Sequence, residues 1–96
     1  MRIDYHPEAE AELLGAAAHY GRQADALGAR FVDEIEQAIS TIAVAPLVWP
    51  IVEGEVRRYL VRRFPYGVYY RVLPDRLRIL AIKHHRRHPE YWRGRR

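Results

Sequence analysis

The fold of this chain is decided by the segment RRYLVRRFPYGVYYRVLPDRLRILAIK, residues 57–83. Apolar and polar residues alternate along it with the period of two that is typical of half-buried strands. We predict three strands here, over residues 57–62, 67–72 and 76–83, with Pro74 and the aspartate after it in a tight turn between the last two. The third strand has apolar residues on both faces, so we place it in the interior of the sheet.

The N-terminal half has a helical period instead. Residues 2–6 alternate as a short strand, and Pro7 then begins a helix, because its missing N–H would be unpaired at that position in any case. Gly21 is a plausible end of this helix, and a second helix runs from Asp25 to Pro46. Two helices with so short a link form an antiparallel hairpin.

The order of elements is therefore β-α-α-β-β-β. Residues 46–55 form a loop whose bulky apolar side chains indicate that it packs down over the core. We predict an α+β fold in which the N-terminal helical hairpin packs on one face of a small antiparallel β-sheet. One domain is expected over residues 1–96, with a basic C-terminal tail from about residue 86.

Charge is divided unevenly along the chain. Residues 1–55 hold three arginines against ten acidic residues, a net charge of −7, whereas residues 56–96 hold thirteen cations against two acids, a net charge of +11. Fifteen of the 16 cations are arginine, whose planar guanidinium binds carboxylate or phosphate through paired hydrogen bonds. The basic half predicts an acidic or polyanionic partner.

Composition also excludes several classes of protein. The chain has no cysteine, which rules out disulfides and thiolate metal sites and fits a reducing cytosol. No apolar run approaches the ~20 residues that span a bilayer, and residues 1–4 lack the apolar stretch of a signal peptide. We expect a cytoplasmic protein with no membrane association.

Seven short strings, taken together, resemble a known family. They are HPEAE at residues 6–10, EL at 12–13, GxxF at 28–31, APxxxP at 45–50, RR at 57–58, RRFPYGVYYRV at 62–72 and KHHRRHPEYW at 83–92. In this order and at these spacings they resemble the RelE/ParE family of bacterial toxins from type II toxin–antitoxin modules. The resemblance covers essentially the whole chain and implies a growth-inhibiting toxin that a cognate antitoxin silences, with no cofactor.

The family has two kinds of member, and the resemblance favours one of them. ParE-like members poison DNA gyrase, whereas RelE-like members cut messenger RNA on the ribosome. The long helices, the proline-bounded loop and the Phe64-Pro65-Tyr66 strand entry look more like the ParE and plasmid-stabilisation branch. Our first hypothesis is a non-enzymatic gyrase inhibitor, and the alternative is a ribosome-dependent mRNA endoribonuclease.

A nuclease site requires cations on the phosphate, a general base and a proton donor. Arg62 and Arg87 are the candidates for phosphate binding, and His85 and Tyr91 for base and acid. The resemblance places Tyr91 on the functional tyrosine of RelE-like nucleases, but His85 stands where many of them carry arginine. The competing interpretation is that His84 and His85 merely point to opposite faces of a strand end.

The remaining candidate residues are binding residues. The resemblance implies that an acidic or apolar antitoxin segment crosses the sheet and the adjoining hairpin. We predict that this segment contacts Arg58, Leu60 and Arg71. For the target we assign the tail residues Arg86, Arg87, Tyr91 and Trp92. A tail this basic is often disordered, but its two aromatic residues favour partial docking, because a free tail has no use for their contact area. His84, His85 and His88 are poor metal ligands together, because no acid or cysteine completes a coordination shell and neighbours on a strand diverge.

Overall fold

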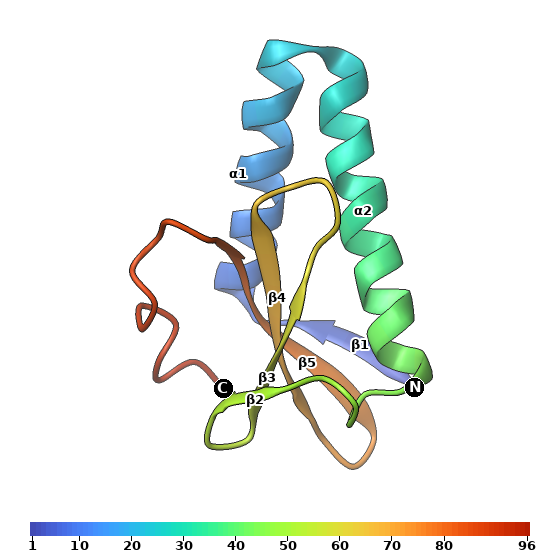
Figure 1. The fold of residues 1–96 in the computed structure, drawn as a ribbon, viewed down its shortest axis with the longest axis vertical. Coiled ribbons are helices and arrows are strands. Elements are labelled where there is room, and N and C mark those ends of the chain that lie inside the picture. Colours follow the sequence, from blue (N-terminus) through green and yellow to red (C-terminus); the bar gives the residue numbers. More distant parts are fainter.

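The computed structural model describes every residue from Met1 to Arg96 and contains two long helices and five strands (Figure 1). In chain order the elements are β1 (Arg2–Tyr5), α1 (Pro7–Gln23), α2 (Asp25–Val44), β2 (Ile51–Glu53), β3 (Val56–Leu60), β4 (Tyr66–Val72) and β5 (Arg76–His84). The predicted α+β class is confirmed, and the prediction omits only β2, a three-residue strand inside the predicted loop. No helix is both long and apolar enough to cross a membrane.

The helical hairpin begins where the sequence predicts. Pro7 is the first residue of α1, and His6 caps the helix with Nδ1, which accepts a hydrogen bond from the backbone N–H two residues later at 3.0 Å. The helix continues two residues past Gly21, and Ala24 alone, in an extended conformation, links it to α2. Gly28 lets the helices meet closely near this link, because a Cβ there would lie 2.9 Å from a carbonyl oxygen of α1.

The sheet is mixed, so the prediction of a wholly antiparallel sheet is wrong for one pair of strands. The strand order is β1-β5-β4-β3-β2, and β1 runs parallel to β5 with Ile3 opposite Leu77. The backbone N–H of His6 extends this pairing with a hydrogen bond to the carbonyl oxygen of Ile79 at 2.8 Å. The direction in which two ends of a chain meet depends on everything between them, and local alternation carries no information about it.

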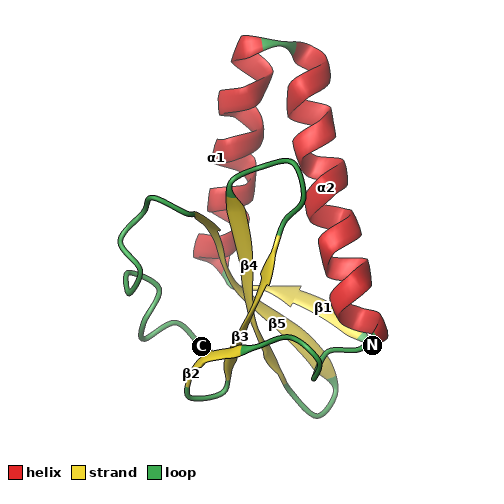
Figure 2. Cartoon of the chain, viewed as in Figure 1, coloured by secondary structure: helices red, strands yellow, loops and turns green.

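Both helices cover one face of the sheet, and no helix covers the other (Figure 2). The main core lies between these two layers. Its largest fully buried side chains come from α2, β4 and β5, and they include Phe31, Ile35, Ile42, Val68, Tyr70, Leu77 and Ile79. A second, smaller buried cluster lies elsewhere and joins Tyr69, Ala81 and Trp92.

The loop before β2 packs down on the sheet as predicted. The ring of Trp49 lies edge-on to Tyr59, with centroids 4.7 Å apart. Arg57 donates hydrogen bonds to the carbonyl oxygens of Leu47 and Trp49, at 3.0 and 2.7 Å. The Tyr70 hydroxyl donates to the carbonyl oxygen of Pro46 at 2.7 Å, so core and loop are tied together by side chains on two strands.

A β-bulge in β5 changes which of its side chains face the helices. Tyr69 lies opposite Ala81 while Tyr70 lies opposite Ile79, which leaves Leu80 as an extra residue on β5. As a result Ile79 and Ile82, three positions apart, both join the helical core. β5 lies between β1 and β4, so the interior position predicted from its two apolar faces is confirmed.

Candidate functional site

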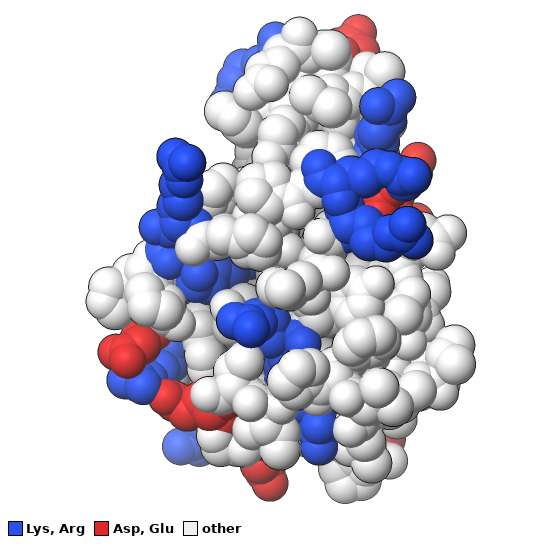
Figure 3. Space-filling view, in the orientation of Figure 1, with Lys and Arg blue, Asp and Glu red and all other residues white.

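The uncovered face of the sheet collects the residues predicted to bind an antitoxin. Arg58 lies opposite Tyr69 and Leu60 lies opposite Gly67, so strand alternation puts Arg58, Leu60 and Arg71 on this one face. Leu60 is 53% exposed, and Arg71 pairs with the exposed carboxylate of Glu55 at 2.9 Å. Basic side chains lie in several separate groups on the surface shown in Figure 3, among uncharged residues and a few acids.

An apolar groove borders this face. It has a volume of about 330 Å³ and is lined by Trp49, Pro50, Arg58, Tyr59 and Leu60. Next to it in the chain, large apolar side chains of the loop and of β2 stand exposed, namely Leu47, Val48 and Ile51. An exposed leucine beside an arginine is the combination expected to receive an apolar anchor flanked by carboxylates.

The basic tail folds back over the uncovered face. Trp92 is buried, with its ring 5.3 Å from that of Tyr69, and it completes the second buried cluster. Arg93 pairs with Glu53 of β2, and the carbonyl oxygen of Arg96 accepts a hydrogen bond from Arg78 at 3.0 Å. The C-terminal tail is therefore ordered in this structure. Trp92, which we predicted to contact a target, can do so only if the tail leaves this position.

Glu12 of α1 anchors this tail, and our sequence prediction missed it. Its Oε1 accepts hydrogen bonds from the backbone N–H of Ile82 at 3.1 Å and from Arg95 at 3.0 Å, while Oε2 lies 3.4 Å from Arg87. Arg95 also donates to the carbonyl oxygen of Leu80 at 3.0 Å. The sequence did contain one signal for this role. Position 12 lies on the same face of α1 as its core residues, and a carboxylate on a buried face needs a partner.

The four candidate nuclease residues do not form one assembled site. Arg62 lies in the exposed turn after β3, and no hydrogen bond or ion pair joins it to the other three. His85 is exposed just after β5. Partial loss of hydration, and after it the neighbouring charges of His84, Lys83 and Arg58, lower its pKa. Arg87 and Tyr91 do meet, with the guanidinium 3.8 Å from the centre of the tyrosine ring.

The hydroxyl of Tyr91 is poorly placed for a proton donor. It is buried and makes no hydrogen bond, although the Glu12 carboxylate lies close to it. Burial, and after it the contact of the hydroxyl with the Glu12 carboxylate, raises the pKa of Tyr91 well above its ordinary value. Tyr91 therefore keeps its proton at neutral pH. Its hydroxyl group cannot donate that proton to a ligand while the tail is docked.

The adjacent histidines diverge, as the alternating geometry of a strand requires. His84 packs edge-on against Tyr66, with ring centroids 5.1 Å apart, on the helical side of the sheet. His85 is exposed, and the Nδ1 atoms of His84 and His88 each accept a backbone N–H two residues later. No three histidine or acidic side chains are grouped to hold a metal ion.

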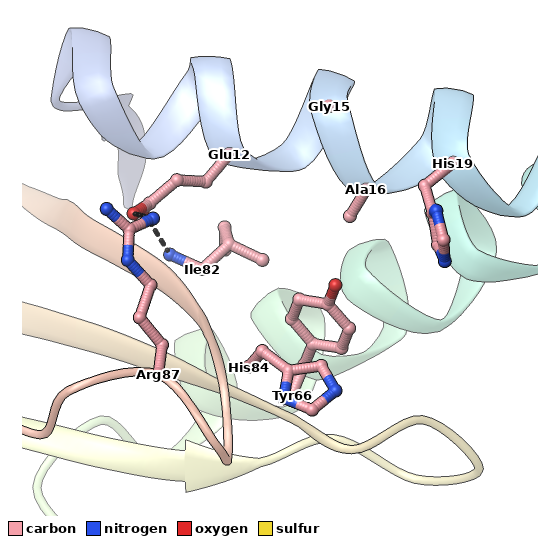
Figure 4. Close-up of a pocket in the computed structure, with 8 residues that line it drawn as sticks. All are labelled: Glu12, Gly15, Ala16, His19, Tyr66, Ile82, His84 and Arg87. Atoms are coloured by element: carbon pink, nitrogen blue, oxygen red, sulfur yellow. Dashed lines mark hydrogen bonds and ion pairs between the residues drawn. The ribbon is translucent and has the colours of Figure 1, made fainter.

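A cleft that sequence reasoning did not find lies between α1 and the end of β5 (Figure 4). It has a volume of about 290 Å³. Its walls come from four parts of the chain, and it is lined by Glu12, Gly15, Ala16, His19, Tyr66, Ile82, His84 and Arg87. Apart from Arg87, none of these residues was predicted to bind anything, because only the tertiary fold brings them together.

A helical hairpin packed on one face of a small sheet is the arrangement that the resemblance to type II toxins implied. Residues 3–89 match the family described as the ParE toxin of type II toxin–antitoxin systems, parDE. Because this match spans most of the sequence, the chain belongs to the ParE toxin family.

A comparison with solved structures agrees with the fold. The chain is similar to one described as "Chromosomal ParDE TA system from P. aeruginosa", with a TM-score of 0.64 and 19% sequence identity, over 88% of this chain and 95% of the other. No curated protein sequence matches the chain significantly.

Proposed function

We propose that this chain arrests bacterial growth by inhibiting DNA gyrase and that a cognate antitoxin silences it by direct binding. The observation that carries the proposal is the match of residues 3–89 to the ParE toxin family. ParE-like toxins, which the chain resembles, poison gyrase. The solved structure with a similar fold comes from a ParDE toxin–antitoxin system, which is consistent with a partner of the same kind here.

The chemistry of the candidate residues supports an inhibitor over a nuclease. A nuclease needs a base, an acid and a cation converging on one phosphate. Here Arg62 lies in a separate turn, and the Tyr91 hydroxyl is buried without a partner. A protein that acts by binding needs no such convergence, and it gains from the net positive charge of residues 56–96.

The proposed antitoxin site is the uncovered face around Arg58, Leu60 and Arg71, together with the apolar groove beside it. Arg58 belongs to both the face and the groove, so one partner segment can pair its carboxylates with arginine and place an apolar side chain beside Leu60. We expect the antitoxin segment to be acidic with an apolar anchor. Such a segment would be disordered alone and would order on binding.

The test of the gyrase proposal is a supercoiling assay with purified gyrase and relaxed plasmid DNA. Added in stoichiometric excess, the chain should lower the yield of supercoiled product, and pre-incubation with the antitoxin encoded beside it should restore that yield. The same chain expressed alone should stop growth of the host. Unchanged supercoiling together with growth arrest would refute gyrase as the target while keeping the toxin assignment.

One observation favours the alternative, a ribosome-dependent endoribonuclease. Arg87 stacks on Tyr91 at 3.8 Å, which keeps a phosphate-binding cation next to a tyrosine that retains its proton. If the tail opened on the ribosome, this pair would be the acid and the electrostatic stabiliser of the cut. Primer extension on translated messages from induced cells decides the matter, and new cut sites that disappear in Tyr91→Phe would establish the nuclease.

A further inference from the structure

The cleft of Figure 4 lies apart from the surface proposed for the antitoxin. Tyr66, Ile82 and His84 line it from the helical side of the sheet, whereas Arg58 and Leu60 belong to the uncovered face. Its volume of about 290 Å³ is at the lower end for small-molecule sites. A ligand bound here would therefore not occupy the surface around Arg58 and Leu60.

Small residues on α1 keep this cleft open. Gly15 and Ala16 belong to its wall, and the Ala16 methyl group points toward Tyr66 (Figure 4). A Cβ added at Gly15 would have no atom within 4 Å, so the space beside it is empty of packing partners. Because Gly15 belongs to the wall of the cleft, a larger side chain there would narrow the cleft without displacing the core.

The only carboxylate in the cleft is already neutralised. Both oxygens of Glu12 accept hydrogen bonds from Arg95, and Oε1 also accepts the backbone N–H of Ile82. Arg87 lies 3.4 Å from Oε2, and its guanidinium stacks on Tyr91, which orients it at the mouth of the cleft. Two guanidiniums against one carboxylate leave this end of the cleft with an excess of positive charge.

The other polar groups in the wall are hydrogen-bond donors. The Nδ1 of His84 accepts the backbone N–H of Arg86 at 3.0 Å, so the neutral ring carries its proton on Nε2. The Nε2 atom of His19 lies 3.1 Å from the side-chain amide of Gln23, which leaves the Nδ1 atom of this ring free for another partner. Burial, and then the neighbouring Tyr20, raises the pKa of Tyr66, which keeps its hydroxyl protonated.

We propose that this cleft binds a phosphate group, presented by a nucleotide or by the end of a nucleic-acid strand, through Arg87, His84, His19 and Tyr66. Donors on several walls, an arginine at the mouth and no carboxylate left unpaired are the arrangement that suits an oxyanion with several oxygens. The inference does not rest on the proposed function, because it concerns the isolated chain and a different side of the sheet.

The test is an NMR titration of the isolated chain with sodium phosphate, with sodium chloride and sodium acetate at equal ionic strength as controls. Phosphate should shift the amide signals of Gly15, His19 and His84 saturably, with a dissociation constant on the order of 1 mM, while Gly54 in the β2–β3 turn stays unchanged. Signals that move equally with chloride, or a site that takes acetate as tightly, would overturn the proposal.

Two further probes separate the sources of the phosphate. Adenosine 5′-monophosphate that binds more tightly than inorganic phosphate indicates a nucleotide. A 5′-phosphorylated oligonucleotide that binds more tightly than both, and more tightly than the same strand without its phosphate, indicates a strand end. Equal binding of the oligonucleotide with and without its phosphate counts against the cleft.

Matched variants test the walls. Arg87→Ala should weaken phosphate binding about tenfold through loss of a charge-assisted hydrogen bond, while Arg30→Ala, which removes the same charge from an exposed position on α2, should change it less than about twofold. Gly15→Leu should abolish binding by filling the cleft, and Gly15→Ala should retain it. If Gly15→Leu binds phosphate like the unmodified chain, the ligand is not in this cleft.

Discussion

The carboxylate of Glu12 and the guanidinium of Arg95 form an ion pair that fastens the C-terminal tail to α1, with Oε1 and Nη1 3.0 Å apart. Both side chains are only 11% exposed. The same carboxylate satisfies the backbone N–H of Ile82, beyond the point where β1 stops pairing with β5. One residue near the start of the chain therefore stabilises both a strand edge and the tail.

Replacing Glu12 should destabilise the protein markedly. Glu12→Ala leaves Arg95 largely buried without its partner and the Ile82 N–H unpaired, and we expect the free energy of unfolding to fall by about 2–4 kcal/mol. Urea denaturation measures it. Glu10→Ala, an exposed residue of the same helix, is the control and should cost under about 1 kcal/mol. Equal losses in the two variants would show that Glu12 anchors nothing.

The packing of Trp92 should depend on its size and not on its indole N–H. Trp92→Ala removes the contact with Tyr69 and should cost about 3 kcal/mol. Trp92→Phe should cost less than half as much, because the buried Nε1 of Trp92 has no hydrogen-bond partner to lose. Thermal unfolding followed by circular dichroism compares the two. A tail that is not docked in solution would make both substitutions nearly neutral.

The close approach of the two helices should make Gly28 irreplaceable. A Cβ at this position would lie 2.9 Å from the Ala17 carbonyl oxygen and 3.0 Å from the Cα of Gly21. We expect Gly28→Ala to cost about 1–3 kcal/mol, in spite of the better helix propensity of alanine. Gly15→Ala, which meets no atom, should instead raise the melting temperature slightly. Melting curves that move in the same direction for both would contradict the helix contact.

The hydroxyl of Tyr91 should make the protein sensitive to alkali. Its pKa is raised in the folded state, so above about pH 10 the unfolded chain loses this proton first and the free energy of unfolding falls as pH rises. In Tyr91→Phe this fall should be shallower, and near neutral pH the variant should lose at most about 1 kcal/mol, since the buried hydroxyl has no partner. Urea midpoints at about pH 8 and about pH 11 give the comparison. Parallel pH profiles for the two proteins would argue against a buried hydroxyl.

Substitutions on the uncovered face should weaken antitoxin binding without unfolding the toxin. Leu60→Asp puts a charge on an exposed position beside the apolar groove, and Arg58→Glu reverses a charge in its wall. We expect each to raise the dissociation constant at least about tenfold. Arg22→Glu, an exposed arginine in the last turn of α1, is the matched control and should have little effect. Calorimetry with the cognate antitoxin measures all three, and equal affinities would move the antitoxin site elsewhere.

Much of the fold could be predicted because its signals are local. The start of α1 follows from Pro7, and β3, β4 and β5 follow from alternation within residues 57–83, each to within two residues of the observed ends. The loop at Trp49 packs as its apolar composition indicates. Of the five strands, only β2 was not predicted, because three residues are too few to show an alternating pattern.

What the residues alone could establish, then, were the elements, the charge division and the family, because dihedral preference, side-chain period and residue order are properties of neighbouring positions. The parallel direction of β1, the docking of Trp92 and the cleft beside His84 required the folded molecule. Each of these unites groups far apart in the sequence, such as Glu12 with Arg95. Contacts between residues so far apart form only when the whole chain has folded. The conformational preferences of adjacent residues do not determine which distant residues meet.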